Sequence, residues 1–220
     1  MEPLTMETLA ALATLWFVHL LAVISPGPSL LVVARSAIAG SRARGARVAL
    51  GLGLGTLVWS LAALFGLSVL FALAPWLYTG MKLAGAAFLL YIAAMMWRHA
   101  REPVPLEGAG ADARDGAPVL ARGPLAAVRL GLLTQLANPK VAVFFGSIFV
   151  TLLPAEPSSG VQAAVIAIVC VNEVGWYTAV AYAFGVRRLR LGYARAKTWI
   201  DRTCGGFLAL LGVRLVFEGR

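Results

Sequence analysis

Long runs of apolar residues, each longer than a soluble core helix or strand requires, dominate the chain. A membrane-spanning helix needs about 20 such residues, so the pattern predicts an all-α integral membrane protein with six transmembrane helices. The sixth run is the shortest and carries Asp201, Arg202 and Arg214. The six runs are Leu9–Ile38, Val48–Leu73, Trp76–Trp97, Leu125–Leu153, Val161–Val186 and Trp199–Phe217.

Composition supports the same class of protein. Of the 220 residues, 60% are hydrophobic and 13% are charged, and the mean hydropathy is +0.82. Soluble domains have about 25% charged residues, so a water-soluble globule is excluded. Six spans and their loops use nearly the whole length, which leaves no room for a soluble catalytic domain. We therefore expect one membrane domain over residues 1–220. No nucleophile beside a base indicates an enzyme, so no enzyme activity is expected.

A polar segment divides the chain near its midpoint. Residues 99–124 are rich in Ala, Gly, Asp, Arg and Pro, a composition typical of a flexible linker. It separates a first three-span half, about 8–98, from a second, about 125–217. Because three is an odd number of crossings, the second half must run inverted relative to the first. The third and sixth runs also resemble each other, with GAAFLLYIAAMMW at Gly85–Trp97 and GGFLALLGVRLVF at Gly205–Phe217.

The positive charge indicates an orientation. The net charge is +9, and most Lys and Arg residues fall in the connections after the first, third and fifth runs. Basic loops remain in the cytoplasm, so both termini are predicted outside and the linker is predicted cytoplasmic. No aromatic residues alternate with these charges as a nucleic-acid stacking groove would require, so the basic residues are expected to contact lipid headgroups.

Proline motifs interrupt the first and fourth runs near their middles: Ser25-Pro26-Gly27-Pro28 and Asn138-Pro139-Lys140. Each run would be about 45 Å long as one helix, against a hydrocarbon core of about 30 Å. Proline has no N–H and breaks the helical hydrogen-bond ladder, yet it suits the first turn of a new helix. Each half-helix would then aim its N–H groups and partial positive charge into the membrane interior, where a substrate carboxylate would be stabilised. The alternative is a packing kink. Breaks at matching places in two inverted halves favour a central transport site.

Glu173 is the only acidic residue deep within any run. Ionisable groups at this depth are costly and usually line a cavity or face a partner. Glu173 is therefore predicted to bind a substrate ammonium group or to carry the coupled proton. The alternative is a structural ion pair with Lys140, which itself could neutralise a substrate carboxylate. Asn172, Asn138 and Gln135 offer further polar contacts to a substrate, although each of these amides could instead bridge helices.

The remaining motifs do not indicate a cofactor. His19 is predicted to form a helix–helix hydrogen bond, because one histidine does not make a metal site, and no metal or other cofactor is expected. The run Gly51-Leu-Gly-Leu-Gly55 begins an apolar helix without a preceding strand, so close helix packing is a better explanation than nucleotide binding. There is no Walker sequence, so transport would be driven by an ion gradient or by the gradient of the substrate itself.

Together these motifs resemble the lysine exporter and homoserine/threonine exporter (LysE/RhtB) family of bacterial inner-membrane amino-acid exporters. The resemblance covers nearly the whole chain and rests on HLLAVISPGPSLLVV, GARVALGLGLGTLVW, KLAGAAFLLYIAAMMWR, GLLTQLANPKVAVFF and the closing GGFLALLGVRLVF. It implies efflux of amino acids or close derivatives, driven by the proton-motive force, from a homodimer in the inner membrane. It also implies that Glu173, three residues before Trp176, occupies the acidic position of the family's fifth span.

The sequence therefore predicts an inner-membrane amino-acid exporter working by proton antiport. Its expected partners are the amino-acid substrate, H⁺, the lipid bilayer and a second copy of the chain, and not nucleic acid. The predicted substrate-binding residues are Ser25, Pro26, Gly27, Pro28, Asn138, Pro139, Lys140, Asn172 and Glu173, with Glu173 also coupling the proton. The alternatives are a metal-cation exporter of a related superfamily and a membrane scaffold that transports nothing.

Overall fold

The computed structural model describes residues 5–73, 76–102, 123–138, 140–142, 144–146 and 157–217. Within these ranges all regular secondary structure is helical, which confirms the all-α prediction. The helices are α1 (Met6–Ile24), α2 (Pro28–Ala39), α3 (Arg42–Leu73), α4 (Trp76–His99), α5 (Pro124–Leu136), α7 (Ser159–Phe184) and α8 (Arg187–Phe217). Residues 140–142 and 144–146 are also helical. Most of the predicted linker, 103–122, lies outside the described residues.

Three of the helices are long and apolar enough to cross a membrane: α1, the Arg42–Gly66 part of α3, and α7. The apolar segments Pro28–Ile38 and Pro124–Leu136 are shorter. Among the described residues, neither α4 nor α8 meets the same criterion. Membrane insertion is thus supported, and the count of six spans stays a prediction.

The first apolar run breaks at its proline motif. Helix α1 ends at Ile24, and the N–H of Ser25 makes a last helical bond to the carbonyl of Leu21 at 3.1 Å. Gly27 is extended (φ −171°, ψ −174°) and precedes Pro28, the first residue of α2. The cause is local, because neither Pro26 nor Pro28 can donate the N–H that would continue α1.

The fourth run also breaks, between α5 and the helical residues that start at Lys140. Helix α5 ends at Leu136. The side-chain oxygen of Asn138 accepts the backbone N–H of Lys140 at 3.1 Å, as an N-cap does. Pro139 lies outside the described residues. Both breaks therefore fall where the sequence predicts them.

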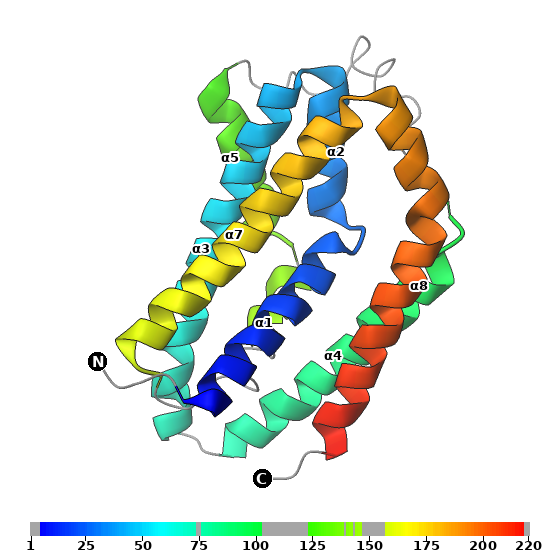
Figure 1. Ribbon diagram of the computed structural model, residues 1–220. Coiled ribbons are helices and arrows are strands. Elements are labelled where there is room, and N and C mark those ends of the chain that lie inside the picture. Colours follow the sequence, from blue (N-terminus) through cyan, green and yellow to red (C-terminus); the bar gives the residue numbers. More distant parts are fainter. Residues whose placement is uncertain are drawn as a thin grey trace.

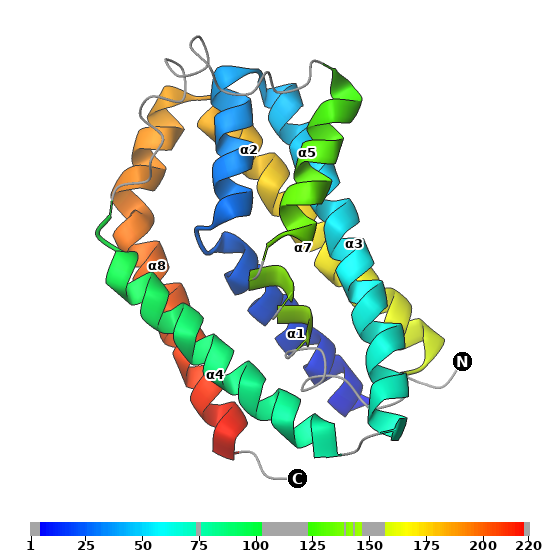
Figure 2. The ribbon, with the colours of Figure 1, turned by 180° about the vertical axis from the view of Figure 1, so that it is seen from behind.

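Helix α3 packs closely against α5 and α7 (Figures 1 and 2). Gly51 on α3 and Gly131 on α5 face each other's backbones, so that a Cβ on Gly131 would collide with the carbonyl of Val48 and lie against the N–H of Leu52. Small residues let membrane helices approach this closely. The expected packing role of the Gly51–Gly55 run is confirmed.

We expect Gly131→Ala to destabilise the protein by about 1–3 kcal/mol, because α3 and α5 must separate to admit one methyl group. Gly175→Ala on α7 is the matched control, since a Cβ there meets nothing within 4 Å. Alanine is the better helix former by about 1 kcal/mol, so the control should be neutral or stabilised. Thermal unfolding of the two purified variants in detergent distinguishes them, and equal melting temperatures would contradict the packing argument.

Helices α4 and α8 form a pair along one side of the molecule (Figure 1). The pair is bonded near the C-terminus of α4, where the indole of Trp97 donates to the carbonyl of Arg202 at 3.1 Å and the hydroxyl of Thr198 donates to that of Ala100 at 3.0 Å. Helix α8 begins at Arg187, twelve residues before the predicted span at Trp199. Hydropathy locates a membrane span and not a helix end, and Arg and Lys are good helix formers, so the basic connection continues the helix.

Among the described residues the core forms two apolar clusters. One contains Val161, Val165 and Val169 of α7, and the other contains Tyr177 and Val180 of the same helix. Between them lies a set of buried polar side chains, which we call the polar layer: His19, Ser25, Ser29, Thr56, Gln135, Asn138 and Glu173. Both helix breaks reach this layer.

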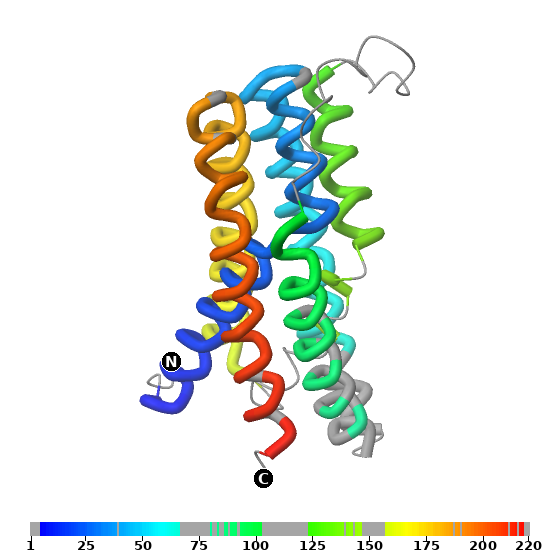
Figure 3. Tube along the Cα trace, turned by 90° about the vertical axis from the view of Figure 1, so that its right-hand side faces the viewer, coloured from blue at the N-terminus to red at the C-terminus, as the bar shows by residue number. Residues whose placement is uncertain are grey.

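The bundle has two distinct ends. The first turn of α1 and the last turn of α8 lie at one end (Figure 3). The turns joining α2 to α3 and α7 to α8 lie at the other (Figure 1). At this second end Gly185 packs against the side chain of Arg42, so two of the basic connections lie together.

Candidate functional site

Glu173 projects from α7 into the polar layer and is only 3% exposed. Its Oε1 accepts a hydrogen bond from Nε2 of Gln135 at 2.8 Å. Its Oε2 lies 3.7 Å from Nε2 of His19 on α1. A buried carboxylate is tolerated only with partners of this kind. The direct ion pair with Lys140 that the sequence left open is not the contact that Glu173 makes.

Gln135, the residue before the end of α5, connects the helices around this carboxylate. The side chain is fully buried. Its amide nitrogen also donates to the hydroxyl of Thr56 on α3 at 2.8 Å, and its amide oxygen accepts from the hydroxyl of Ser29 on α2 at 2.9 Å. The α5 break places one amide within reach of three other helices.

Lys140 follows the second break and reaches the end of α1. Its ammonium donates to the backbone carbonyls of Ala22 at 2.9 Å and Ser25 at 3.1 Å. The carbonyl of Ala22 would normally bond the N–H four residues later, but that residue is Pro26, which has none. The lysine supplies the missing donor and places a positive charge at a helix C-terminus, where it is favourable.

Two further side chains hold the breaks together. The hydroxyl of Tyr177 on α7 donates to the carbonyl of Val23 at 3.3 Å. The amide nitrogen of Asn138 donates to the hydroxyl of Ser29, in the first turn of α2, at 3.0 Å. The ends of both broken helices are therefore bonded to each other and to α7.

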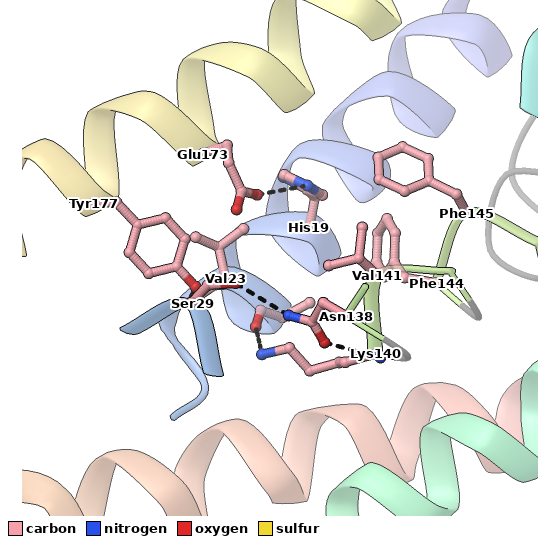
Figure 4. A pocket seen from close by; sticks show the side chains of 11 residues that line it. His19, Val23, Ser29, Asn138, Lys140, Val141, Phe144, Phe145, Glu173 and Tyr177 are labelled. Carbon is pink, nitrogen blue, oxygen red and sulfur yellow. Dashed lines mark hydrogen bonds and ion pairs between the residues drawn. The ribbon is translucent and has the colours of Figure 1, made fainter. Parts of the chain in front are cut away.

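A cavity lies at the centre of this arrangement (Figure 4). Its volume is about 20 Å³, enough for about one water molecule. Glu173 and Lys140 both line it, so one buried carboxylate and one partly buried ammonium face the same space. The other lining residues are His19, Ala22, Val23, Ser29, Asn138, Val141, Phe144, Phe145 and Tyr177.

The structure brings together most of the residues that the sequence selected. Ser25, Asn138, Lys140 and Glu173 meet in or beside the polar layer, while Pro26, Gly27 and Pro28 form the link between α1 and α2. Pro139 lies outside the described residues. Asn172 does not line the cavity, because its amide donates to the carbonyl of Trp16 on α1 at 3.0 Å. It bridges two helices, which is the alternative that the sequence left open.

The predicted substrate-binding residues leave out several side chains of the cavity and its network: His19, Ser29, Thr56, Gln135 and Tyr177. Of these, Gln135 was considered only as a further polar contact or a bridge between helices. Helical spacing carried a signal for two of them. Tyr177 follows Glu173 by four residues and Gln135 precedes Asn138 by three, so each lies about one turn from a selected residue. Thr56 carried no such signal, because only the approach of α3 to α5 brings it near.

No group of three or more His, Cys, Asp or Glu side chains that could hold a metal ion occurs in the described part of the chain. Cys170 and Cys204 are both free thiols.

Two broken apolar helices that meet at a cavity lined by both a carboxylate and an ammonium group are typical of a membrane transport protein. Comparison with known proteins agrees with this class. The family model described as LysE type translocator matches residues 20–219. The chain therefore belongs to the LysE-type translocator family.

Individual relatives align over nearly the full length. The chain is 31% identical to the threonine efflux proteins of Escherichia coli (strain K12) and of Salmonella typhimurium, over 93% of this chain and 97% of each relative. It is 27% identical to the uncharacterized membrane protein YahN of Escherichia coli (strain K12), over 100% of this chain and 95% of that one. No solved structure matches the chain.

Proposed function

We propose that this protein exports a small amino acid from the cytoplasm across the bacterial inner membrane. The proposal rests on one observation: Lys140 and Glu173 line the same cavity, at the junction of two broken helices. An amino acid is a zwitterion, and the ammonium and carboxylate of the protein are the charges that would complement it. A hydrophobic substrate would complement neither charge, and a purely anionic one would leave the carboxylate without a counter-charge.

In the proposed binding mode the substrate carboxylate lies by Lys140 and the N-terminus of α2. A Cβ on Gly27 would lie 3.4 Å from the lysine ammonium, so the lysine is beside the start of that helix. Both the ammonium and the helix N-terminus attract an anion. The substrate ammonium then binds Glu173.

The cavity is smaller than any amino acid, so the substrate must replace contacts that now close it. Its carboxylate would draw Lys140 from the carbonyls at the end of α1. Its ammonium would take the place of Gln135 and His19 at the carboxylate of Glu173. The present arrangement is thus a closed conformation in which each charge is satisfied within the protein.

We further propose that the protein alternates access by rocking two inverted three-helix repeats about this cavity. The packing supports the pairing of equivalent helices, because α3 lies against α7 and α4 against α8. The meeting of the two basic turns at one end of the bundle supports a cytoplasmic assignment for that end. Proton antiport through Glu173, both termini outside and assembly as a homodimer belong to the same proposal.

Threonine is the first substrate to test, because relatives aligned over nearly the whole chain are named threonine efflux proteins. The hydroxyl of Ser29 and the amide of Asn138 line the cavity and would suit a side chain with a hydroxyl group. We expect cells that lack their own exporters, and that express this protein, to release threonine faster than cells with an empty vector.

The experiment loads such cells with dipeptides covering all amino acids and measures the free amino acids that appear outside. Selective release of threonine or of a few related amino acids supports the proposal. If the protein is abundant in the membrane and no amino acid is released selectively, the proposal is wrong, and the scaffold and metal-cation alternatives take its place.

A further inference from the structure

His19 is the one histidine in the polar layer, and its position is unusual for a residue that only joins two helices. It is 3% exposed and lies on α1, six residues before the break at Ser25. Its Nε2 lies 3.7 Å from Oε2 of Glu173. Its other ring nitrogen, Nδ1, is buried and has no hydrogen-bond partner in the described part of the chain. Leaving such an atom unsatisfied costs free energy, which suggests that it acquires a partner in another state.

The imidazole lies between the carboxylate and two aromatic rings (Figure 4). The ring centroids of His19 and Phe144 are 5.2 Å apart at an interplanar angle of 66°, and those of His19 and Phe145 are 6.2 Å apart. These phenylalanines belong to the segment after the second break. They cover the side of the histidine away from Glu173.

Other titratable groups surround Glu173, but two of them are hydrogen-bonded to backbone carbonyls and not to the carboxylate. Lys140 donates to the carbonyls of Ala22 and Ser25. Tyr177, which is on α7 like Glu173, donates to the carbonyl of Val23. Cys170 lies one turn before Glu173 on α7 and is partly buried. From α3, α5 and α2 the neighbours are Thr56, Gln135 and Ser29, none of which titrates in the ordinary range. His19, whose Nε2 lies 3.7 Å from Oε2 of Glu173, is thus well placed to exchange a proton with the carboxylate.

We propose that His19 and Glu173 together form the proton site of this transporter, with His19 as the residue that passes the proton to the carboxylate. This inference rests on the proposed function. Histidine suits the role because one ring nitrogen can accept a proton while the other donates one. His19 lies between the carboxylate and the rings of Phe144 and Phe145, so a proton that enters past these rings reaches the imidazole before it reaches Glu173.

A proton from the outer side binds Nδ1 of His19 and forms an imidazolium. The proton on Nε2 then passes to Oε2 of Glu173, and its bonding electron pair returns to the ring. The neutral carboxyl group binds the substrate ammonium less tightly, so the substrate leaves to the outside and the proton stays in its place. Without a proton, bound substrate can still exchange for a second substrate molecule, which is the exchange that counterflow measures. After the return to the inward-facing state, Glu173 releases the proton to the cytoplasm and the imidazole returns from its Nδ1–H to its Nε2–H tautomer, so one proton enters for each amino acid exported.

The test uses the full-length protein in proteoliposomes with radiolabelled threonine, and compares wild type with His19→Gln. Counterflow at equal pH on both sides measures binding and alternating access without net proton movement. Uptake or release driven by a pH gradient, together with substrate-evoked proton movement, measures coupling. We expect His19→Gln to keep counterflow within about twofold of wild type and to lose about tenfold or more of the gradient-driven transport. His99→Gln is the matched control, because that side chain bonds to Met95 outside the polar layer.

The other possible results of these transport assays contradict either this inference or the proposed function. Full gradient-driven transport and proton movement in His19→Gln overturn this inference alone. Loss of counterflow in His19→Gln also overturns it, because the histidine would then bind substrate or support the fold. If the wild-type protein shows counterflow but a pH gradient has no effect on its transport, the protein is not a proton antiporter and this inference is wrong as well. If wild-type protein gives no counterflow with threonine or any other amino acid, the proposed function itself fails.

Discussion

Export by a Glu173→Gln variant is expected to fall by about 30-fold or more, while the protein remains folded in the membrane. Glutamine has nearly the same shape and keeps an oxygen that can accept the hydrogen bond from Gln135. It lacks the negative charge that balances the substrate ammonium and the capacity to carry a proton. Removing one member of a buried charge pair costs about 2–5 kcal/mol, which corresponds to about 30-fold or more in binding.

The measurement is the dipeptide-loaded efflux assay at equal membrane abundance, with Glu7→Gln as the matched control. Glu7 is an exposed residue in the first turn of α1, so the same chemical change there should leave export unchanged. Lys140→Ala tests the opposite charge of the cavity and should also reduce export. Normal export by both Glu173→Gln and Lys140→Ala would show that the cavity is not the transport site.

Lys197→Met is expected to lower the free energy of unfolding by about 3–5 kcal/mol. The ammonium of Lys197 lies 2.7 Å from Oδ2 of Asp201, and the two side chains are 9% and 3% exposed. It also donates to the carbonyl of His99, the last residue of α4, at 2.7 Å. The substitution therefore leaves a buried carboxylate without its counter-charge and removes a bond between α4 and α8.

Thermal unfolding in detergent should show a decrease in melting temperature of about 6 °C or more for Lys197→Met. Arg195→Met, on the exposed face of the same helix, removes a positive charge without burying an unpaired one and should change the melting temperature little. The double variant Lys197→Met/Asp201→Leu should recover part of the loss, because no buried charge remains. Equal melting temperatures for Lys197→Met and Arg195→Met would contradict the importance of the pair.

The two charges of the proposed site differed in how far the sequence could predict their surroundings. Glu173 could be selected from its depth alone, because a lone acid in an apolar run is costly wherever the helix packs. Its partners could not, since Gln135 and His19 belong to other helices. For Lys140 the sequence suggested Glu173 or the substrate as the partner. Instead its ammonium bonds the end of α1, because Pro26 leaves a carbonyl there without a donor.

For Asn172 and α8, too, the sequence alone could not show the contacts that helix packing makes. Asn172 is adjacent to Glu173 in sequence, but successive helical residues point about 100° apart, and only the packing of α1 against α7 decided that its amide would bond Trp16. The basic residues before Trp199 were assigned to a connection from their charge. They continue α8, because helix formation there depends on propensity and on packing against α4, and not on hydropathy.

The sequence by itself determined that this is an all-helical membrane protein of the LysE-type translocator family, and it located both helix breaks. These properties are local: hydropathy is read within one run, and a proline lacks its N–H whatever surrounds it. Only the tertiary structure decided which groups meet at the breaks. Ser29 bonds Gln135 across 106 residues of sequence, and Lys140 bonds Ala22 across 118. Such contacts depend on how separate helices pack, so the pairing of His19 with Glu173 and the shared cavity of Glu173 and Lys140 emerged only from the fold.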